Sequence, residues 1–203
     1  MGCILGKHFS VNLPNRLTVA RFVMSAVFAG LLSSDWGFRS TVAWLLFGAA
    51  SLTDYWDGEI ARRRNLVTDF GALMDPLVDK VLASAAYICL VGAHAVPAWV
   101  AVCIIGREFL ITGLRQLALT KGEVLPADRW GKHKTIWQII MILYFFLLLS
   151  IDEWIAAGWI PALPWRGVWW EGLGGVLTWV VLILTVGSGI GYLWRNRWMI
   201  ADR

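Results

Sequence analysis

Charged residues and cysteines are both scarce in this sequence. Asp, Glu, Lys and Arg make up 16% of the 203 residues, whereas 58% are hydrophobic. The three cysteines, Cys3, Cys89 and Cys103, are too scattered for a disulfide framework or a zinc site. A soluble domain of this length can bury a core, but it does not carry repeated apolar runs long enough to cross a bilayer. Such runs recur here, so the composition favours an integral membrane protein.

Six apolar segments approach the length that a membrane-spanning helix needs, which is about 20 residues. They are Leu17–Ser33, Thr41–Thr53, Leu73–Val91, Val96–Leu119, Ile136–Ser150 and Gly175–Leu193. The second reaches spanning length only if its helix continues through Asp54 and Asp57. Carboxylates at membrane depth are costly and usually face a polar cavity. The sequence thus predicts an all-α integral membrane fold with six transmembrane helices.

The basic residues predict how these helices are oriented. Thirteen Lys and Arg residues lie before or in the first turns of the first predicted span, between spans two and three, between four and five, or after the sixth, whereas only Arg39 and Arg166 lie on the opposite side. Because cytoplasmic loops carry the excess of Lys and Arg, both termini, including segment 1–16, are predicted to be cytoplasmic. The net charge of +4 follows from this asymmetry and from anionic headgroups, so no nucleic-acid partner is predicted.

The chain is predicted to form a single membrane domain over residues 1–203. Its one longer stretch between spans, 152–173, falls on the outer side and is rich in tryptophan. Because the indole ring is amphipathic and concentrates at membrane–water interfaces, this outer loop is interpreted as an interfacial collar. A site that stacks a sugar or a lipid is the alternative. The tryptophans of this loop are Trp154, Trp159, Trp165, Trp169 and Trp170.

Four aspartates are spaced so that they fall on two helix faces. Positions three or four apart share a face of a helix, so Asp54 and Asp57 form one stripe with Gly58 and Ala61 beyond them. Gly71, Asp75 and Asp79 form a matching stripe on the next predicted span. The connection between these spans is short, which makes them antiparallel neighbours whose stripes can face each other.

Four converging carboxylates would repel one another unless a cation lay between them. Ligation by oxygen alone suits Mg²⁺ or Mn²⁺, and Mg²⁺ is usually held by carboxylates together with substrate phosphates. Gly58, Ala61 and Gly71 lack bulk and so leave room for a nucleotide or a pyrophosphate. Arg62 can reach a phosphate with a fork of donors. The alternative is that these charges are solvated at helix ends, with Arg62 part of an ordinary cytoplasmic loop.

The whole segment resembles the signature of the CDP-alcohol phosphotransferase family, D-x2-D-G-x2-A-R-x8-G-x3-D-x3-D, and meets every signature position. The resemblance implies an enzyme that moves a phosphatidyl group from a CDP-linked lipid to an alcohol, and a homodimer. It implies that Asp79 is the general base and also a ligand of a two-metal centre with Asp54, Asp57 and Asp75. The CDP site that it implies is formed by Gly58, Ala61, Arg62 and Gly71.

Cations on the fourth and fifth predicted spans indicate a pocket for an anionic acceptor such as a phosphorylated polyol. Arg107 and Arg115 are eight residues apart and hence nearly on one face, and Lys132 and Lys134 open the fifth span. Cations inside a membrane protein are candidates for function. Two alternatives remain: Lys132 and Lys134 are ordinary loop charges, or Arg107 pairs with a carboxylate such as Glu108 or a metal ligand.

Three shorter runs resemble the branch of the family that makes phosphatidylglycerophosphate. They are 12–21, 106–109 with Leu114 and Arg115, and 131–135. They imply CDP-diacylglycerol as donor and glycerol 3-phosphate as acceptor, in the cytoplasmic (inner) membrane with the active site on the cytoplasmic side. Inositol phosphate or phosphatidylglycerol are the rival acceptors. A divalent-cation transporter is a remote alternative, because clustered intramembrane carboxylates also mark ion pathways.

Overall fold

The computed structural model describes the backbone of residues 13–64, 69–123, 125, 129–162, 164 and 167–199. It describes the side chains of this part except those of 13–21, 53–79, 129, 130, 132 and 199. Within these ranges every regular element is a helix, which confirms the all-α prediction. In chain order they are α1 (Leu13–Leu32), α2 (Arg39–Arg64), α3 (Asp69–Gly92), α4 (Ala98–Thr120), α5 (Arg129–Ala156), the π-helical turn η1 (Val168–Leu173), α6 (Gly174–Arg195) and the 3₁₀ turn η2 (Arg197–Met199).

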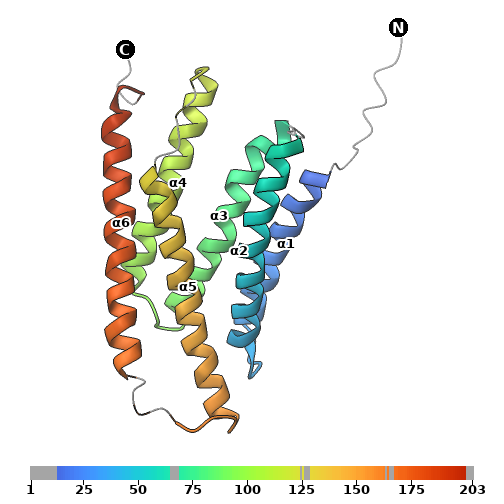
Figure 1. Ribbon diagram of the computed structural model, residues 1–203, viewed down its shortest axis with the longest axis vertical. Helices are drawn as coiled ribbons and strands as arrows, with labels where there is room; N and C mark the ends of the chain where they lie inside the picture. The colour runs from blue at the N-terminus through green and yellow to red at the C-terminus, as the bar shows by residue number, and fades with distance from the viewer. Residues whose placement is uncertain are drawn as a thin grey trace.

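The long helices stand side by side and alternate in direction (Figure 1). The end of α2 and the start of α3 lie at the upper end of the view, together with the start of α1, the end of α4, the start of α5 and the end of α6. We call this the motif end, because the aspartate signature straddles the α2–α3 connection, and we call the opposite end the far end. The chain therefore crosses the bundle once with each long helix.

Each long helix coincides with all or nearly all of one of the six predicted apolar segments. The second segment, Thr41–Thr53, is too short by itself, but α2 begins at Arg39 and runs without a break to Arg64. It therefore continues through Asp54 and Asp57, as spanning length requires. The α2 sequence contains no proline, so no missing amide hydrogen or ring clash interrupts it where the apolar residues give way to charged ones.

Glycines in the left-handed backbone region end two of the helices. Gly122 has a φ of 77° and follows α4, and Gly158 has a φ of 75° and follows α5. After α5, the Gly158 amide donates to Ile155 O (3.0 Å) and the Trp159 amide donates to Trp154 O (2.9 Å). This pattern satisfies carbonyls that the helix end would leave unpaired, and the positive φ strains any residue with a Cβ. Helix α5 therefore extends six residues past Ser150, the end of the predicted apolar run.

Helix covers both ends of the predicted outer loop 152–173. Trp154 lies in α5, while Trp169 and Trp170 lie in η1. The Trp170 ring packs edge-to-face on Phe145 of α5, with 5.9 Å between centroids, and the Trp159 ring stacks on Phe38 at 4.8 Å. Trp165 lies outside the described residues. The four described tryptophans of this loop lie at the far end of the bundle, and the role of the loop as an interfacial collar stays a prediction.

Apolar side chains both fill the bundle and cover its outside. The core is centred on residues such as Phe28, Tyr87, Ile104 and Phe146, and Phe28 meets Phe146 edge-to-face at 5.5 Å. The outer surfaces of α1 to α6 are also apolar. Among the described residues, His133–Ala156 and Val168–Arg195 are long and apolar enough to cross a membrane. Exposed apolar side chains include Val27, Leu45, Ile88, Val102, Ile140 and Ile183.

One glutamate joins the first turn of α2 to the last turns of α5. Glu153 Oε1 accepts a hydrogen bond from the Ser40 amide (2.6 Å), and Oε2 accepts from the amide (2.9 Å) and hydroxyl (2.8 Å) of Thr41. The Trp154 indole also donates to the Thr41 hydroxyl (3.1 Å). A carboxylate at a helix N-terminus satisfies amide hydrogens that have no partner within the helix and opposes the positive end of the helix dipole.

We expect Glu153→Ala to lower the free energy of unfolding by about 2 kcal/mol, the upper range for losing a helix cap. The amides of Ser40 and Thr41 lose their acceptor, so the thermal midpoint measured in detergent should fall by several degrees. Glu171→Ala, at an exposed position in η1, is the control and should leave the midpoint in place. Equal midpoints for both variants would contradict the cap.

Candidate active site

The backbone places the aspartate signature on two helices that meet at the motif end. Asp54 and Asp57 lie in the second half of α2, and Asp75 and Asp79 lie in the first half of α3. Gly58, Ala61 and Arg62 follow on α2, while Gly71 precedes on α3. The side chains of these eight residues lie outside the described part of the chain. That the four carboxylates converge therefore stays a prediction.

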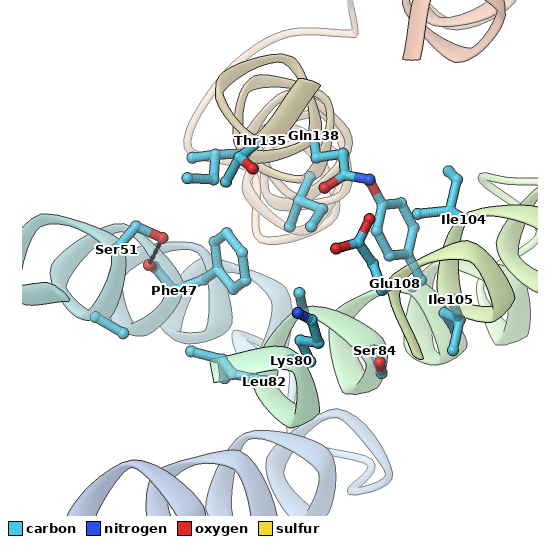
Figure 2. Close-up of a pocket in the computed structure, with 15 residues that line it drawn as sticks. Phe47, Ser51, Lys80, Leu82, Ser84, Ile104, Ile105, Glu108, Thr135 and Gln138 are labelled. Atoms are coloured by element: carbon cyan, nitrogen blue, oxygen red, sulfur yellow. Dashed lines mark hydrogen bonds between the residues drawn. The ribbon is translucent and has the colours of Figure 1, made fainter. Parts of the chain in front are cut away.

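A cavity of about 260 Å³ lies between α2, α3, α4 and α5, next to the signature. Ser51 lines it from α2, one helical turn before Asp54, and Lys80 lines it from α3, directly after Asp79. Both helices that carry the signature therefore border the same space. Figure 2 shows Lys80, Glu108 and Gln138 reaching toward this space from α3, α4 and α5.

At this cavity a single carboxylate, that of Glu108, joins α4 to α5. Lys134 Nζ donates a hydrogen bond to Glu108 Oε1, and Arg107 Nη1 donates to the same oxygen at 3.3 Å. Only 3% of the Lys134 side chain and 12% of the Arg107 side chain are exposed, against 19% for Glu108. Two cations are thus held beside one anion in a largely apolar interior, where charges interact far more strongly than in water.

Helix α6 fixes the other side of the Arg107 side chain. Arg107 Nη2 donates to the Ser188 hydroxyl at 3.2 Å. A Cβ placed on Gly189 would lie 2.9 Å from Arg107 Cγ, so the absence of a side chain at this position lets the arginine pass close to the α6 backbone. Arg107 Nε is buried and has no hydrogen-bond partner among the described residues. The guanidinium is therefore oriented by Glu108 and Ser188, while its Nε–H has no acceptor among the described residues.

Further polar groups line the cavity between its apolar walls. Gln138 Nε2 donates to the Thr185 hydroxyl at 3.3 Å, which links α5 to α6. The Tyr87 hydroxyl is buried in the cavity wall without a hydrogen-bond partner within the described part of the chain. Tyr87 and Glu108 both line this cavity. A buried polar group without a partner is costly and points to a molecule that the site takes up.

The structure brings together two of the four cations predicted to bind the acceptor. Arg107 and Lys134 meet at Glu108, so Lys134 is an interior residue rather than an ordinary loop charge. The alternative that Arg107 pairs with Glu108 is also confirmed. Arg115 lies two turns further along α4 and is exposed, and the Lys132 side chain lies outside the described residues. Their part in the pocket stays a prediction.

Glu108 is the functional candidate that the sequence did not single out, beyond naming it as a possible partner of Arg107. A signal was present, because Glu108 is an ionisable residue in the middle of an apolar segment, and such residues mark sites by default. What the sequence did not contain is its pairing with Lys134, 26 positions away. Within the described residues no three His, Cys, Asp or Glu side chains are grouped closely enough to hold a metal ion.

Comparison with known proteins connects this arrangement to a family. The family model described as CDP-alcohol phosphatidyltransferase matches residues 11–187, a range that contains the whole aspartate signature, Glu108 and Lys134. The match thus covers far more than half of the chain.

Three relatives extend the likeness over nearly the full length. The CDP-diacylglycerol–glycerol-3-phosphate 3-phosphatidyltransferase of Bacillus subtilis (strain 168) is 38% identical over 197 residues, which cover 91% of this chain and 95% of the relative. The probable phosphatidylglycerophosphate synthase of Mycobacterium tuberculosis (strain CDC 1551 / Oshkosh) is 37% identical and covers 96% and 86%. A phosphatidyltransferase of Rickettsia typhi, with the same name as that of B. subtilis, is 36% identical over 182 residues and covers 89% and 94%.

Both findings agree with the resemblance that the signature carries. The residues of the signature, the length of the match and the all-helical architecture are all consistent with the same family. The chain is therefore a member of the CDP-alcohol phosphatidyltransferase family.

Proposed function

We propose that this chain transfers the phosphatidyl group of CDP-diacylglycerol to glycerol 3-phosphate, and so forms phosphatidylglycerophosphate and CMP. The observation that carries this proposal is the near full-length likeness to relatives named for that reaction. The cavity beside the signature supports it, because Glu108 lines this cavity and contacts Arg107 and Lys134, two cations suited to an anionic acceptor. The reaction class is that of a phosphatidyltransferase in phospholipid biosynthesis.

The proposal includes six membrane spans, α1 to α6, with both termini in the cytoplasm. The apolar outer surfaces and the alternating helix directions support it (Figure 1). The excess of Lys and Arg in the sequence segments predicted to be cytoplasmic, thirteen against two, supports it as well. That distribution favours a cytoplasmic motif end, in the cytoplasmic (inner) membrane, where a water-soluble acceptor reaches the site. Residues 1–203 would form one domain, with 152–173 outside.

Asp54, Asp57, Asp75 and Asp79 are proposed to hold two divalent metal ions, Mg²⁺ or Mn²⁺. The donor set fits, because it consists of carboxylates alone and stands on two helices that border one cavity. When bound, such ions would supply positive charge to the pyrophosphate of the donor. Gly58, Ala61, Arg62 and Gly71 would admit and contact the CDP group.

The remaining steps fall to side chains of the chain itself. Asp79 would take the proton of the acceptor hydroxyl, whose oxygen then forms the new bond to the phosphatidyl phosphorus. The bond from that phosphorus to the oxygen bridging to CMP breaks, and CMP leaves with the electron pair. Arg107 and Lys134 would hold the acceptor phosphate and so keep the hydroxyl within reach of Asp79, which replaces a chance encounter by a fixed geometry. Arg115 and Lys132 would complete this grip.

The homodimer implied by the resemblance is kept as part of the proposal. Its measurement is the mass of the purified protein–detergent complex. If the active protein has the mass of a monomer, the proposed homodimer is wrong, but the proposed reaction is not affected.

The test is a panel of acceptors offered to the purified protein with labelled CDP-diacylglycerol. We expect CMP release with glycerol 3-phosphate, at least about a hundred times faster than with inositol 1-phosphate or phosphatidylglycerol, because a site built for one substrate's polar groups rejects analogues by factors of this order or more. EDTA should abolish the release, and added Mg²⁺ or Mn²⁺ should restore it. Rapid release with another acceptor would refute the choice of glycerol 3-phosphate. Metal uptake into vesicles without any CMP release would favour a transporter.

A further inference from the structure

Glu108 occupies a position that the proposed reaction does not yet explain. It touches both cations assigned to the acceptor phosphate, and it does so with one oxygen, Oε1. It also lines the cavity into which the acceptor would enter. Glu108 is thus placed to act on the acceptor through its neighbours.

Stability alone gives a weak reason for this ion pair. Replacing a buried ion pair by apolar side chains of similar volume is often neutral or stabilising, because desolvation of the charges offsets their attraction. The surrounding walls of the cavity are mainly apolar, with Ile104, Ile105 and Ile139 close by. Packing at this point could therefore be achieved without any charge.

The contacts of Glu108 instead indicate that its carboxylate orients Lys134 and Arg107. Lys134 has a long flexible side chain, yet only 3% of it is exposed and its ammonium is directed at Glu108. Arg107 is held between Glu108 on one side and Ser188 on the other. A carboxylate between two cations also reduces their mutual repulsion, which would otherwise drive them apart in a low-dielectric interior. Its single charge still leaves one positive charge of this pair uncompensated and available to an anion.

We propose that Glu108 is a positioning residue for the acceptor: its carboxylate keeps Lys134 and Arg107 side by side and aimed at the acceptor phosphate. The proposal rests on the proposed function, because it presupposes that these two cations bind glycerol 3-phosphate. The buried Arg107 Nε has no partner among the described residues, and it is one of the donors that the guanidinium keeps for a phosphate oxygen. In this role Glu108 acts on the acceptor through Lys134 and Arg107, the two cations that it contacts.

The experiment compares Glu108→Gln with Glu123→Gln in the acceptor assay. Gln keeps the size of the side chain but removes the charge, so we expect the KM for glycerol 3-phosphate to rise about tenfold, in line with losing a charge-assisted hydrogen bond. The KM for CDP-diacylglycerol should stay within about twofold, because that substrate is bound elsewhere. Glu123 is exposed, just after the end of α4 at the motif end, so its variant controls for the loss of one negative charge. It should leave both KM values unchanged.

A measurement without turnover separates positioning from a general structural role. Glycerol 3-phosphate should raise the thermal midpoint of the unmodified protein and of Glu123→Gln, and it should raise that of Glu108→Gln much less. Glu108→Asp restores the charge on a shorter side chain, and its KM for glycerol 3-phosphate should lie between those of the unmodified protein and Glu108→Gln. If Glu108→Gln cannot be purified in sufficient amount, Glu108→Asp alone tests the proposal. Its KM for glycerol 3-phosphate is then expected to rise about threefold.

Several results would overturn the positioning role. One is an unchanged KM for glycerol 3-phosphate in both Glu108 variants. Another is an equal rise in the KM for glycerol 3-phosphate and the KM for CDP-diacylglycerol. A lower KM would mean that Glu108 competes with the phosphate for the cations and does not aim them. Failure of the proposed function looks different, because the unmodified protein would then release no CMP with glycerol 3-phosphate.

Discussion

Asp79→Asn is expected to slow CMP release by at least about a thousandfold while leaving the protein folded, since general-base catalysis contributes up to 10⁴-fold. The amide is nearly the same size as the carboxylate, so α3 should form as before. It cannot take up the proton of the acceptor hydroxyl, and it is a poorer metal ligand. The measurement is the rate at saturating concentrations of both substrates with Mn²⁺ present.

The control for this variant is Asp35→Asn, an exposed aspartate between α1 and α2 at the far end. Both proteins should elute as single species in detergent and give the same helical circular dichroism. A rate for Asp79→Asn above about a tenth of the original would exclude Asp79 as the base, because other groups rarely replace more than a small part of such a contribution.

Lys134→Ala is expected to raise the KM for glycerol 3-phosphate about a hundredfold, which corresponds to about 2.7 kcal/mol of binding energy. The variant removes a cation from the pocket and leaves Glu108 with Arg107 as its remaining cation of the pair. The KM for CDP-diacylglycerol should change much less. Initial rates measured while one substrate is varied at a time give the two values separately.

Lys121→Ala is the matched control, because Lys121 directly follows α4 at the same end of the bundle and is exposed. We expect no change in either KM. Arg115→Ala should also raise the KM for glycerol 3-phosphate, but less than Lys134→Ala, since the Arg115 side chain is exposed and its charge is screened by water. If Lys134→Ala weakened only the binding of CDP-diacylglycerol, the assignment of the pocket would be wrong.

The helices were predictable because apolar length and helix formation coincide in this chain. Even α2, whose apolar run is short, could be anticipated, since a helix that enters a membrane must satisfy its backbone hydrogen bonds internally and so continues through Asp54 and Asp57. The signature was predictable because its spacing is read directly along each helix. The positions of the helix ends were less predictable. Helix α5 continues to Ala156 because Gly158, and not a change in hydropathy, terminates it.

The contact between Glu108 and Lys134 could not be predicted, for a physical reason. It depends on how α4 and α5 are rotated about their axes, and periodicity reveals that rotation only when one face is polar. Helix α5 is apolar on nearly every side beyond its first turns, so its pattern gives little sign of which face meets α4. Ser188 and Gly189 on α6 carry no charge, and their contacts with Arg107 appear only once the helices are packed.

The hydrogen bonds of Glu153 have a consequence for the opposite end of the molecule. Glu153 connects the start of α2 to the end of α5 at the far end. Because the two helices are antiparallel, both extend from this connection toward the motif end (Figure 1). At about 1.5 Å per residue, Asp57 lies about 24 Å from Thr41 along α2, and Lys134 lies about 28 Å from Glu153 along α5. The proposed donor and acceptor positions therefore stand at nearly the same depth, and their axial register is fixed by a carboxylate on the other side of the bundle.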